Sequence, residues 1–322
     1  MTIKGFLLFG LNPLIIVLRK YKGRKKFVSY GKDNLDKIFY TIGFDDNSGG
    51  LSWFTHRVLM HIGYAIDHGY IPIVDMQNYI SQYLEKGKLH KENAWEYYFE
   101  QPVGITLQDI ENSKNIIISR KTPSPQKEYF MGNFYNDKKR IAYFRSLFKK
   151  YIIINKSTQE YLSNEYEQIL KNKGKVLGVL CRGTDYLLNR PSKHPIQPDP
   201  LDVIKRAEEA LIECNCSHIF LATEDEDIYD YFREHFKDKL LVNQQRRISR
   251  KEMINISAVS IAKSKITRDK NNYLSGLEYL SAINLLSKCS CFIGGRTGGT
   301  KAVLLMTDGF EYEYIYDLGY YK

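Results

Sequence analysis

Cysteine is scarce in this sequence, and its apolar stretches are too short to cross a membrane. The 322 residues include 5 cysteines, which form no disulfide framework in a chain of this length, so a reducing compartment is expected. The two Cys-x-Cys pairs lack the usual spacing of a zinc site and have no paired histidines nearby. The apolar stretch over residues 5–18 is shorter than the roughly 20 residues that a spanning helix needs, and Pro13 interrupts it. The sequence therefore argues against a disulfide scaffold, a zinc site and a spanning helix.

Acidic residues are absent before Phe27. The same segment contains seven lysines and arginines and carries much of the net charge of +10. An apolar stretch followed by clustered basic residues can bind the surface of an anionic membrane. We therefore expect residues 1–26 to make a peripheral membrane contact, with the protein in the cytoplasm at the inner face of the membrane. The alternative is a first core strand followed by a basic loop.

The second half of the chain alternates between apolar strands and helices. Strands are predicted at 175–182, 217–223, 239–244, 290–295 and 312–319, with helices between them. The first half contains a similar unit, with a glycine turn at 48–50, a helix to His68 and a buried strand that ends near Met76. Continuous apolar strands separated by helices indicate parallel sheets covered on both faces. We predict an α/β protein with two Rossmann-like domains, 27–165 and 166–322, which face a cleft that is the default binding site.

A glycine-rich turn, GGRTGGTK at 294–301, follows the fourth of these strands. It resembles a Walker A loop with the last two positions exchanged, which argues against an ATP-driven kinase or motor. Backbone N–H groups at a helix N-terminus, flanked by an arginine and hydroxyls, would bind a diphosphate well. The expected contacts are Arg296, Thr297, Gly298, Gly299 and Thr300. The alternative is a tight turn with glycine for packing.

Charged residues follow two more strands of the same domain. Arg182 ends the first strand, and Asp185 could orient it or hold a sugar hydroxyl, unless the two form only a structural pair. Glu224 or Asp225, after the second strand, could recognise a base or ribose. Asp225 and Asp227 also form a D-x-D sequence, which can hold a metal, although acids at a helix start stabilise its dipole without one.

With these strand ends, the sequence resembles the fucosyltransferase superfamily of GT-B fold, especially the α1,6-fucosyltransferases and the rhizobial nodulation fucosyltransferases. CRGTDY at 181–186 is similar to the family's H-V-R-R-T-D, FLATED to its YLATDD, and the spacing to His194 also agrees. The similarity spans most of the C-terminal half and one element of the N-terminal half. It implies Arg182 and Asp185 as catalytic residues, with Arg182 on the donor β-phosphate. The donor-binding residues that it implies, or that the turns above predict, are Gly183, Thr184, His194, Thr223, Glu224, Asp225, Arg296, Thr297, Gly298, Gly299, Thr300, Ser48, Gly49 and Gly50.

The sequence departs from the family pattern at several positions. The histidine of the arginine motif is Leu180, the second arginine is Gly183, and the basic residue after the aspartate is Tyr186. An aspartate of the helix before the glycine loop is Ala282, and the glutamate expected as acceptor base falls at Arg190. The catalytic base is therefore unassigned. Asp46, His56 and Glu96 are the candidates for the base or for acceptor binding.

The resemblance implies an inverting, metal-independent glycosyltransferase. The expected donor is GDP-fucose, and the expected acceptor is a glycan or lipid-linked glycan in bacterial surface polysaccharide biosynthesis, with no cofactor or metal. The alternatives are a glycosyltransferase of the same fold with another nucleotide-sugar donor, and a transferase of phosphate or sulfate groups. The charge and the 25 tyrosines suggest a nucleic-acid-binding protein, but no recognition helix or RNA-binding motif supports a nucleic-acid partner.

Overall fold

The computed structural model describes residues 25–45, 49–119, 131, 134–249, 251–252 and 268–322. The predicted membrane-contacting segment therefore lies outside the described residues, apart from Lys25 and Lys26. The N-terminal part contains β1 (Lys26–Val28), β2 (Phe39–Ile42), α2 (Leu51–Asp67), β3 (Ile71–Val74), η1 (Gln108–Ile110), β4 (Ile116–Ile118), η3 (Phe134–Asn136), α3 (Lys138–Tyr151) and α4 (Lys156–Ile169). The C-terminal part contains β5 (Val176–Leu180), α5 (Thr184–Asn189), α6 (Pro200–Glu213), β6 (His218–Ala222), α7 (Glu226–Phe236), η4 (Lys237–Lys239), β7 (Leu240–Leu241), α9 (Asn271–Ser287), β8 (Cys291–Gly295), α10 (Gly298–Met306) and β9 (Tyr312–Tyr316).

The C-terminal sheet is parallel throughout and has the strand order β7-β6-β5-β8-β9. The chain runs outward from β5 to β6 and β7, and then returns to the other side of β5 as β8. Open α/β sheets bind ligands at such a reversal, beyond the carboxyl ends of the strands. The reversal lies between β5 and β8, so the loops after these two strands flank the expected binding position.

The N-terminal sheet has the strand order β1-β4-β2-β3, in which β2 is parallel to β3 and β4 while β1 is antiparallel to β4. Here the order reverses between β2 and β4. The glycine turn that begins α2 follows β2, so it leaves the carboxyl end of a strand at this second reversal. The two sheets confirm the predicted α/β architecture.

The strands at the centre of the C-terminal sheet are apolar because helices cover both of their faces. Every residue of β5 and β8 is buried. One face packs against α6 and α7 through residues that include Val203, Ile204 and Phe232. The other face packs against α9 and α10 through residues that include Ile283 and Leu286. Burial on both faces explains the continuous apolar runs in the sequence.

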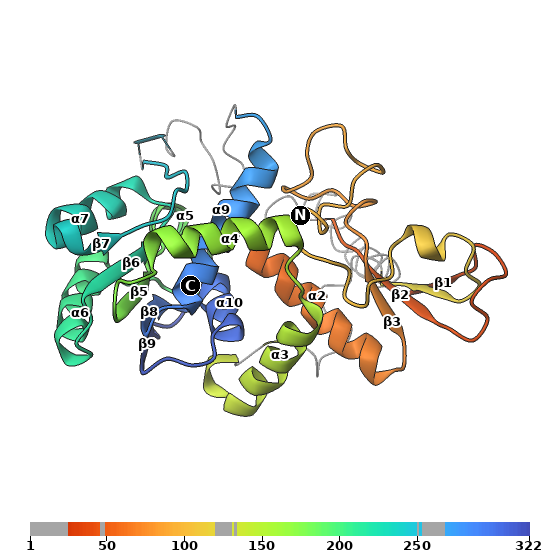
Figure 1. Cartoon of the computed structure of the whole chain (residues 1–322), viewed down its shortest axis with the longest axis horizontal. Helices are drawn as coiled ribbons and strands as arrows, with labels where there is room; N and C mark the ends of the chain where they lie inside the picture. Colours follow the sequence, from red (N-terminus) through yellow and green to blue (C-terminus); the bar gives the residue numbers. More distant parts are fainter. Residues whose placement is uncertain (1–24, 46–48, 120–130, 132–133, 250, 253–267) are drawn as a thin grey trace, which may run out of the picture.

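Helices α2, α4, α9 and α10 lie between the two sheets (Figure 1). Contacts of α10 with α2 and α3, and of α4 with α9, join the two halves of the chain. Tyr98 from the N-terminal half donates a hydrogen bond of 2.8 Å to the carbonyl of Tyr273 in α9, and the two rings are stacked. The predicted domain boundary at 165/166 falls within α4.

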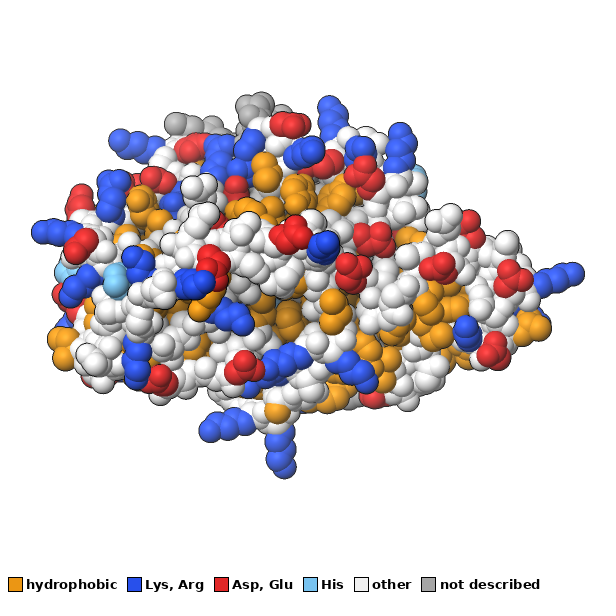
Figure 2. All heavy atoms as spheres, viewed as in Figure 1, with side chains coloured by type: hydrophobic (Ala, Val, Ile, Leu, Met, Phe, Trp, Pro, Cys, Tyr) orange, Lys and Arg blue, Asp and Glu red, His pale blue; other side chains and the backbone are white. Residues whose placement is uncertain are grey.

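Charge is mixed on the face of the molecule shown in Figure 2, where basic and acidic side chains are interspersed. Among the described residues, no helix is both long and apolar enough to cross a membrane.

Candidate functional site

Arg182 and Glu224 face each other at the carboxyl ends of β5 and β6. Arg182 Nε lies 3.3 Å from Glu224 Oε1, and both side chains are largely shielded from solvent. The same carboxylate oxygen accepts a hydrogen bond of 3.2 Å from the backbone N–H of Gly183. The guanidinium also lies 5.2 Å from the ring centre of Tyr186. Arg182 is thus a positive charge held in place by a carboxylate and an aromatic ring.

Asp225 has a structural role beside this pair. It is fully buried, and its Oδ1 accepts hydrogen bonds from the N–H groups of Asp227 and Ile228, which caps α7. Gly183 packs directly against it, since a Cβ on Gly183 would lie 2.1 Å from Asp225 Oδ2. This contact is a physical reason why glycine stands where the family motif has a second arginine. Of the two acids that follow β6, only Glu224 retains access to solvent.

The loop after β8 presents the start of α10 to the same edge of the sheet. Thr297 Oγ1 accepts a hydrogen bond of 3.1 Å from Thr300 N–H and thereby caps the helix. Thr300 Oγ1 in turn donates to the carbonyl of Gly295 at 2.5 Å. The N–H groups of Gly298 and Gly299, in the first turn, have no carbonyl one turn earlier to bind. They are available to an anion at the positive end of the helix dipole.

Arg296 is bound to protein groups on the other side of this loop. Its Nη1 lies 2.8 Å from Asp317 Oδ1, and its Nη2 donates to Asn136 Oδ1 at 3.1 Å. The guanidinium also lies 5.5 Å from the ring centre of Tyr135, whose hydroxyl donates to the carbonyl of Thr297 at 2.5 Å. In this structure Arg296 therefore holds residues 135–136 against the loop.

The start of α2 meets the start of α10, which brings the two halves of the chain together at the site. Ser52 Oγ and Tyr279 Oη are 2.6 Å apart, and a Cβ on Gly298 would lie 3.5 Å from Ser52 Cβ. Burial raises the pKa of Tyr279, while its hydrogen bond with Ser52 and the charge of Arg182 oppose this shift. Gly50 is the N-cap of α2, and Gly49 accepts a hydrogen bond from Gln82. The predicted glycine turn thus lies opposite the predicted diphosphate loop.

His194 contacts Tyr186, and Thr223 precedes Glu224 in the turn after β6. His194 is exposed, and its Nδ1 lies 3.3 Å from Tyr186 Oη. Thr223 is buried and its hydroxyl accepts from the N–H of Asp225 at 3.2 Å, so it orders the turn after β6. Thr184 begins α5, followed by Asp185, and the roles expected for these two residues stay predictions.

The three candidates for the base are not brought together. Asp46, like Ser48, lies outside the described residues. His56 is buried in α2, where burial and the charge of Lys301 lower its pKa to about 3. Such a histidine is neutral at pH 7, but it binds a proton too weakly to be an effective general base.

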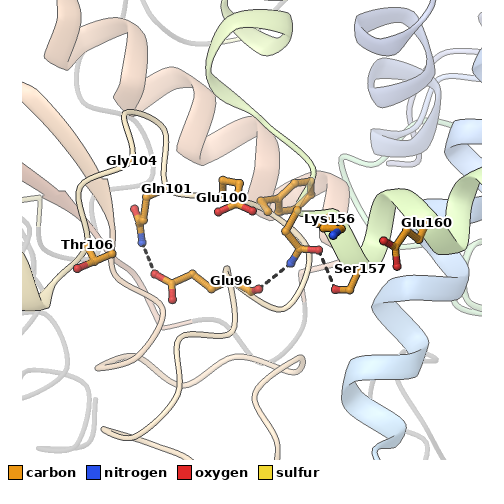
Figure 3. A pocket seen from close by; sticks show the side chains of 10 residues that line it. Glu96, Glu100, Gln101, Gly104, Thr106, Lys156, Ser157 and Glu160 are labelled. Atoms are coloured by element: carbon orange, nitrogen blue, oxygen red, sulfur yellow. Dashed lines mark hydrogen bonds between the residues drawn. The ribbon is translucent and has the colours of Figure 1, made fainter.

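Glu96 lines a separate open pocket of about 600 Å³ between the loop 96–106 and the start of α4 (Figure 3). None of the residues around Arg182 or the glycine loop contributes to this pocket. Glu96 Oε1 accepts a hydrogen bond of 2.7 Å from Gln101, whose amide also binds the N–H and carbonyl of Val74 in the edge strand β3. The amide of Gln101 thus satisfies the backbone of Val74 at the free edge of the sheet, and Glu96 orients that amide.

Sequence reasoning missed several residues of the site because they come from distant segments. Tyr279, Ser52 and Tyr83 border Arg182 or the glycine loop, and the charge of Arg182 acts on both tyrosines. Gln197 is buried, packs against Gly295 and donates weakly to the carbonyl of Arg296. The described part of the chain contains no group of three histidines, cysteines or acids arranged to hold a metal.

The solved structures to which this chain is similar include fucosyltransferases. NodZ α-1,6-fucosyltransferase co-crystallised with GDP aligns over 84% of this chain and 93% of its own, with a TM-score of 0.50 and 14% identity. POFUT1 in its apo form aligns over 88% of this chain and 99% of its own, with a TM-score of 0.50 and 9% identity. The chain has the GT-B fold of fucosyltransferases. This confirms the fold that the sequence resemblance implied. No protein-family model and no curated protein sequence matches the chain.

Proposed function

We propose that this protein is an inverting glycosyltransferase that takes a sugar from a nucleoside diphosphate, with GDP-fucose as the donor. The observation that carries the proposal is the pair of loops at the strand reversal, Arg182 after β5 and Thr297 to Gly299 after β8. The two loops follow neighbouring strands, so they would present a guanidinium and the N–H groups of a helix start to the same diphosphate. The GT-B fold and the GDP in the NodZ crystals add support for a guanine nucleotide.

Breaking the anomeric bond of the donor places negative charge on the leaving diphosphate. Arg182 and the N-terminus of α10 are oriented before the reaction. Glu224 holds the guanidinium of Arg182, and Thr297 caps α10. Preorganised cations and dipoles stabilise such charge strongly in a site shielded from water. These residues would stabilise the leaving group without a metal. Glu224, beside Arg182, is placed to accept hydrogen bonds from a ribose or base.

The acceptor is proposed to be a glycan or lipid-linked glycan used in bacterial surface polysaccharide biosynthesis. The N-terminal basic and apolar segment supports a lipid-linked acceptor, since residues 1–26 would hold the enzyme at the inner face of the membrane. The carboxylate or histidine that deprotonates the acceptor hydroxyl is proposed to come from the N-terminal half, opposite the leaving group.

Removal of the Arg182 charge tests this mechanism. We expect Arg182→Ala to lower the rate of GDP release from GDP-fucose by about 10²-fold or more, the usual cost of losing one charge-stabilising donor. The sugar first formed by the wild type should have the anomeric configuration opposite to that of the donor, and EDTA should leave the rate unchanged. Arg233→Ala, which removes an exposed arginine of α7, is the matched control. Wild-type turnover in folded Arg182→Ala, or activity restored only by Mn²⁺, would contradict the mechanism.

A further inference from the structure

Lys301 follows the glycine loop directly. In a Walker A loop the lysine precedes the residue with the hydroxyl, whereas here it follows Thr300. Within the described part of the chain, no carboxylate is paired with the ammonium of Lys301. Nζ lies 3.5 Å from the carbonyl of Met131 and 5.9 and 5.6 Å from the ring centres of Phe134 and Tyr135. Burial lowers the pKa of Lys301. A lysine with aromatic neighbours and one distant carbonyl keeps most of its hydrogen-bonding capacity unused.

His56 is a second unsatisfied polar group beside it. The residue is 8% exposed, and its Nε2 has no hydrogen-bond partner. It lies on α2, about one turn after Ser52, which contacts the start of α10. α2 and α10 are in contact, and the charge of Lys301 contributes to the low pKa of His56 across this junction.

Lys301 lies in the first turn of α10, directly after the loop that is proposed to bind the donor, and His56 lies on α2, which contacts α10. The backbone N–H of Lys301 donates to the carbonyl of Thr297, and the hydroxyl of Tyr135, whose ring borders Lys301 Nζ, donates to the same carbonyl. A half-buried cation that has no counter-ion among the described residues, and a buried imidazole nitrogen that has no hydrogen-bond partner, are both unfavourable. An anion bound on this side of the loop would satisfy both.

We propose that Lys301 and His56 form a phosphate-binding subsite on the α2 side of the glycine loop. Lys301 donates from its ammonium to a phosphate oxygen, and neutral His56 donates from Nε2. The phosphate belongs either to the nucleoside diphosphate or to a phosphate-bearing lipid acceptor. This inference rests on the proposed function, because it extends the same loop.

Titration of Lys301 variants with phosphate-bearing and phosphate-free ligands tests the subsite. Calorimetry in EDTA would compare GDP, guanosine and a short-chain polyprenyl phosphate, using the wild type, Lys301→Met, Lys301→Arg and His56→Gln. Lys288→Met, at the exposed end of α9, is the matched control. We expect Lys301→Met to weaken GDP binding by about 10- to 100-fold, as for a lost charge-assisted hydrogen bond. Guanosine binding should be unchanged, and Lys301→Arg should recover most of the loss.

Each outcome decides one point. Weaker binding of polyprenyl phosphate with unchanged GDP binding assigns the subsite to the acceptor. A smaller loss of affinity for the same ligand in His56→Gln supports the joint role of His56 and Lys301. Circular dichroism confirms that each variant is folded. If folded Lys301→Met binds both phosphate ligands as the wild type does, while Arg182→Ala loses GDP, the subsite is wrong and the proposed function stands. If the wild type binds no phosphate ligand, the subsite and the proposed function both fail.

Discussion

Replacing Gly183 by alanine should destabilise the protein through a clash with a buried carboxylate. The new Cβ would lie 2.1 Å from Asp225 Oδ2 and 2.6 Å from its Cβ and Cγ, well inside van der Waals contact. The backbone of Gly183, with φ −123° and ψ −134°, is at negative φ, so the clash is the main cause. Asp225 cannot move freely, because hydrogen bonds of 3.0 and 3.1 Å hold it at the start of α7.

The expected size of the effect follows from these two contributions. Overpacking costs about 1–3 kcal/mol, and loss of a helix cap costs about 1 kcal/mol more. The free energy of unfolding should therefore fall by about 2–4 kcal/mol. With a urea m-value of about 3 kcal/mol/M, the midpoint of unfolding moves down by about 1 M.

Urea unfolding followed by circular dichroism measures this shift. The control is Gly50→Ala, because a Cβ there meets no atom within 4 Å, and we expect a loss of at most about 1 kcal/mol. In the double variant Gly183→Ala/Asp225→Gly the clash is removed, so the two losses should not add. A midpoint of Gly183→Ala equal to that of the wild type, or additive losses in the double variant, would refute the clash.

Two further predictions concern the junction of the two halves. Arg145→Met removes hydrogen bonds of 3.0 and 2.9 Å to the carbonyl of Leu304 near the end of α10, and it should lower the free energy of unfolding by about 1.5–3 kcal/mol. Burial, with a smaller effect of Glu278, raises the pKa of Glu165, which accepts a hydrogen bond from Ser281. A raised pKa means that the folded state binds a proton on Glu165 more tightly than the unfolded state does. The stability that this proton contributes is present below the pKa of Glu165 in the unfolded state, about 4.5, and it is lost as the pH rises through the pKa in the folded state. Glu165→Gln should therefore be more stable than the wild type at pH 7 but not at pH 4, and equal midpoints at both pH values would contradict this reading.

The fold could be predicted because its strands carry the signal themselves. The central strands β5 and β8 are buried on both faces, so they read as continuous apolar runs that end in charged or glycine-rich turns. The parallel order of the sheet then brings Arg182, Glu224 and the glycine loop to one edge without further information. The candidate site on the C-terminal sheet was thus accessible from pattern alone.

The remaining features depend on contacts that no local pattern encodes. Ser52 and Tyr279 are 227 residues apart in the sequence, yet their hydroxyls are 2.6 Å apart. The difference between Glu224 and Asp225 arises from burial, because the two acids are adjacent and chemically alike but only Asp225 is sealed under Gly183. The ion pair of Arg296 with Asp317 involves a residue that follows the last strand, while the contact of Arg296 with a diphosphate stays a prediction. Such pairings follow from tertiary packing.

The most direct test of the central claim is a calorimetric titration of the protein with GDP, UDP, CDP and ADP in EDTA. The account predicts binding of GDP without a metal, and loss of that binding in Arg182→Ala while Arg233→Ala keeps it. Preference for another nucleoside diphosphate would retain the phosphate site and contradict the assignment of GDP-fucose. Absence of binding to all four nucleotides would contradict the claim that Arg182 and the start of α10 form a diphosphate site.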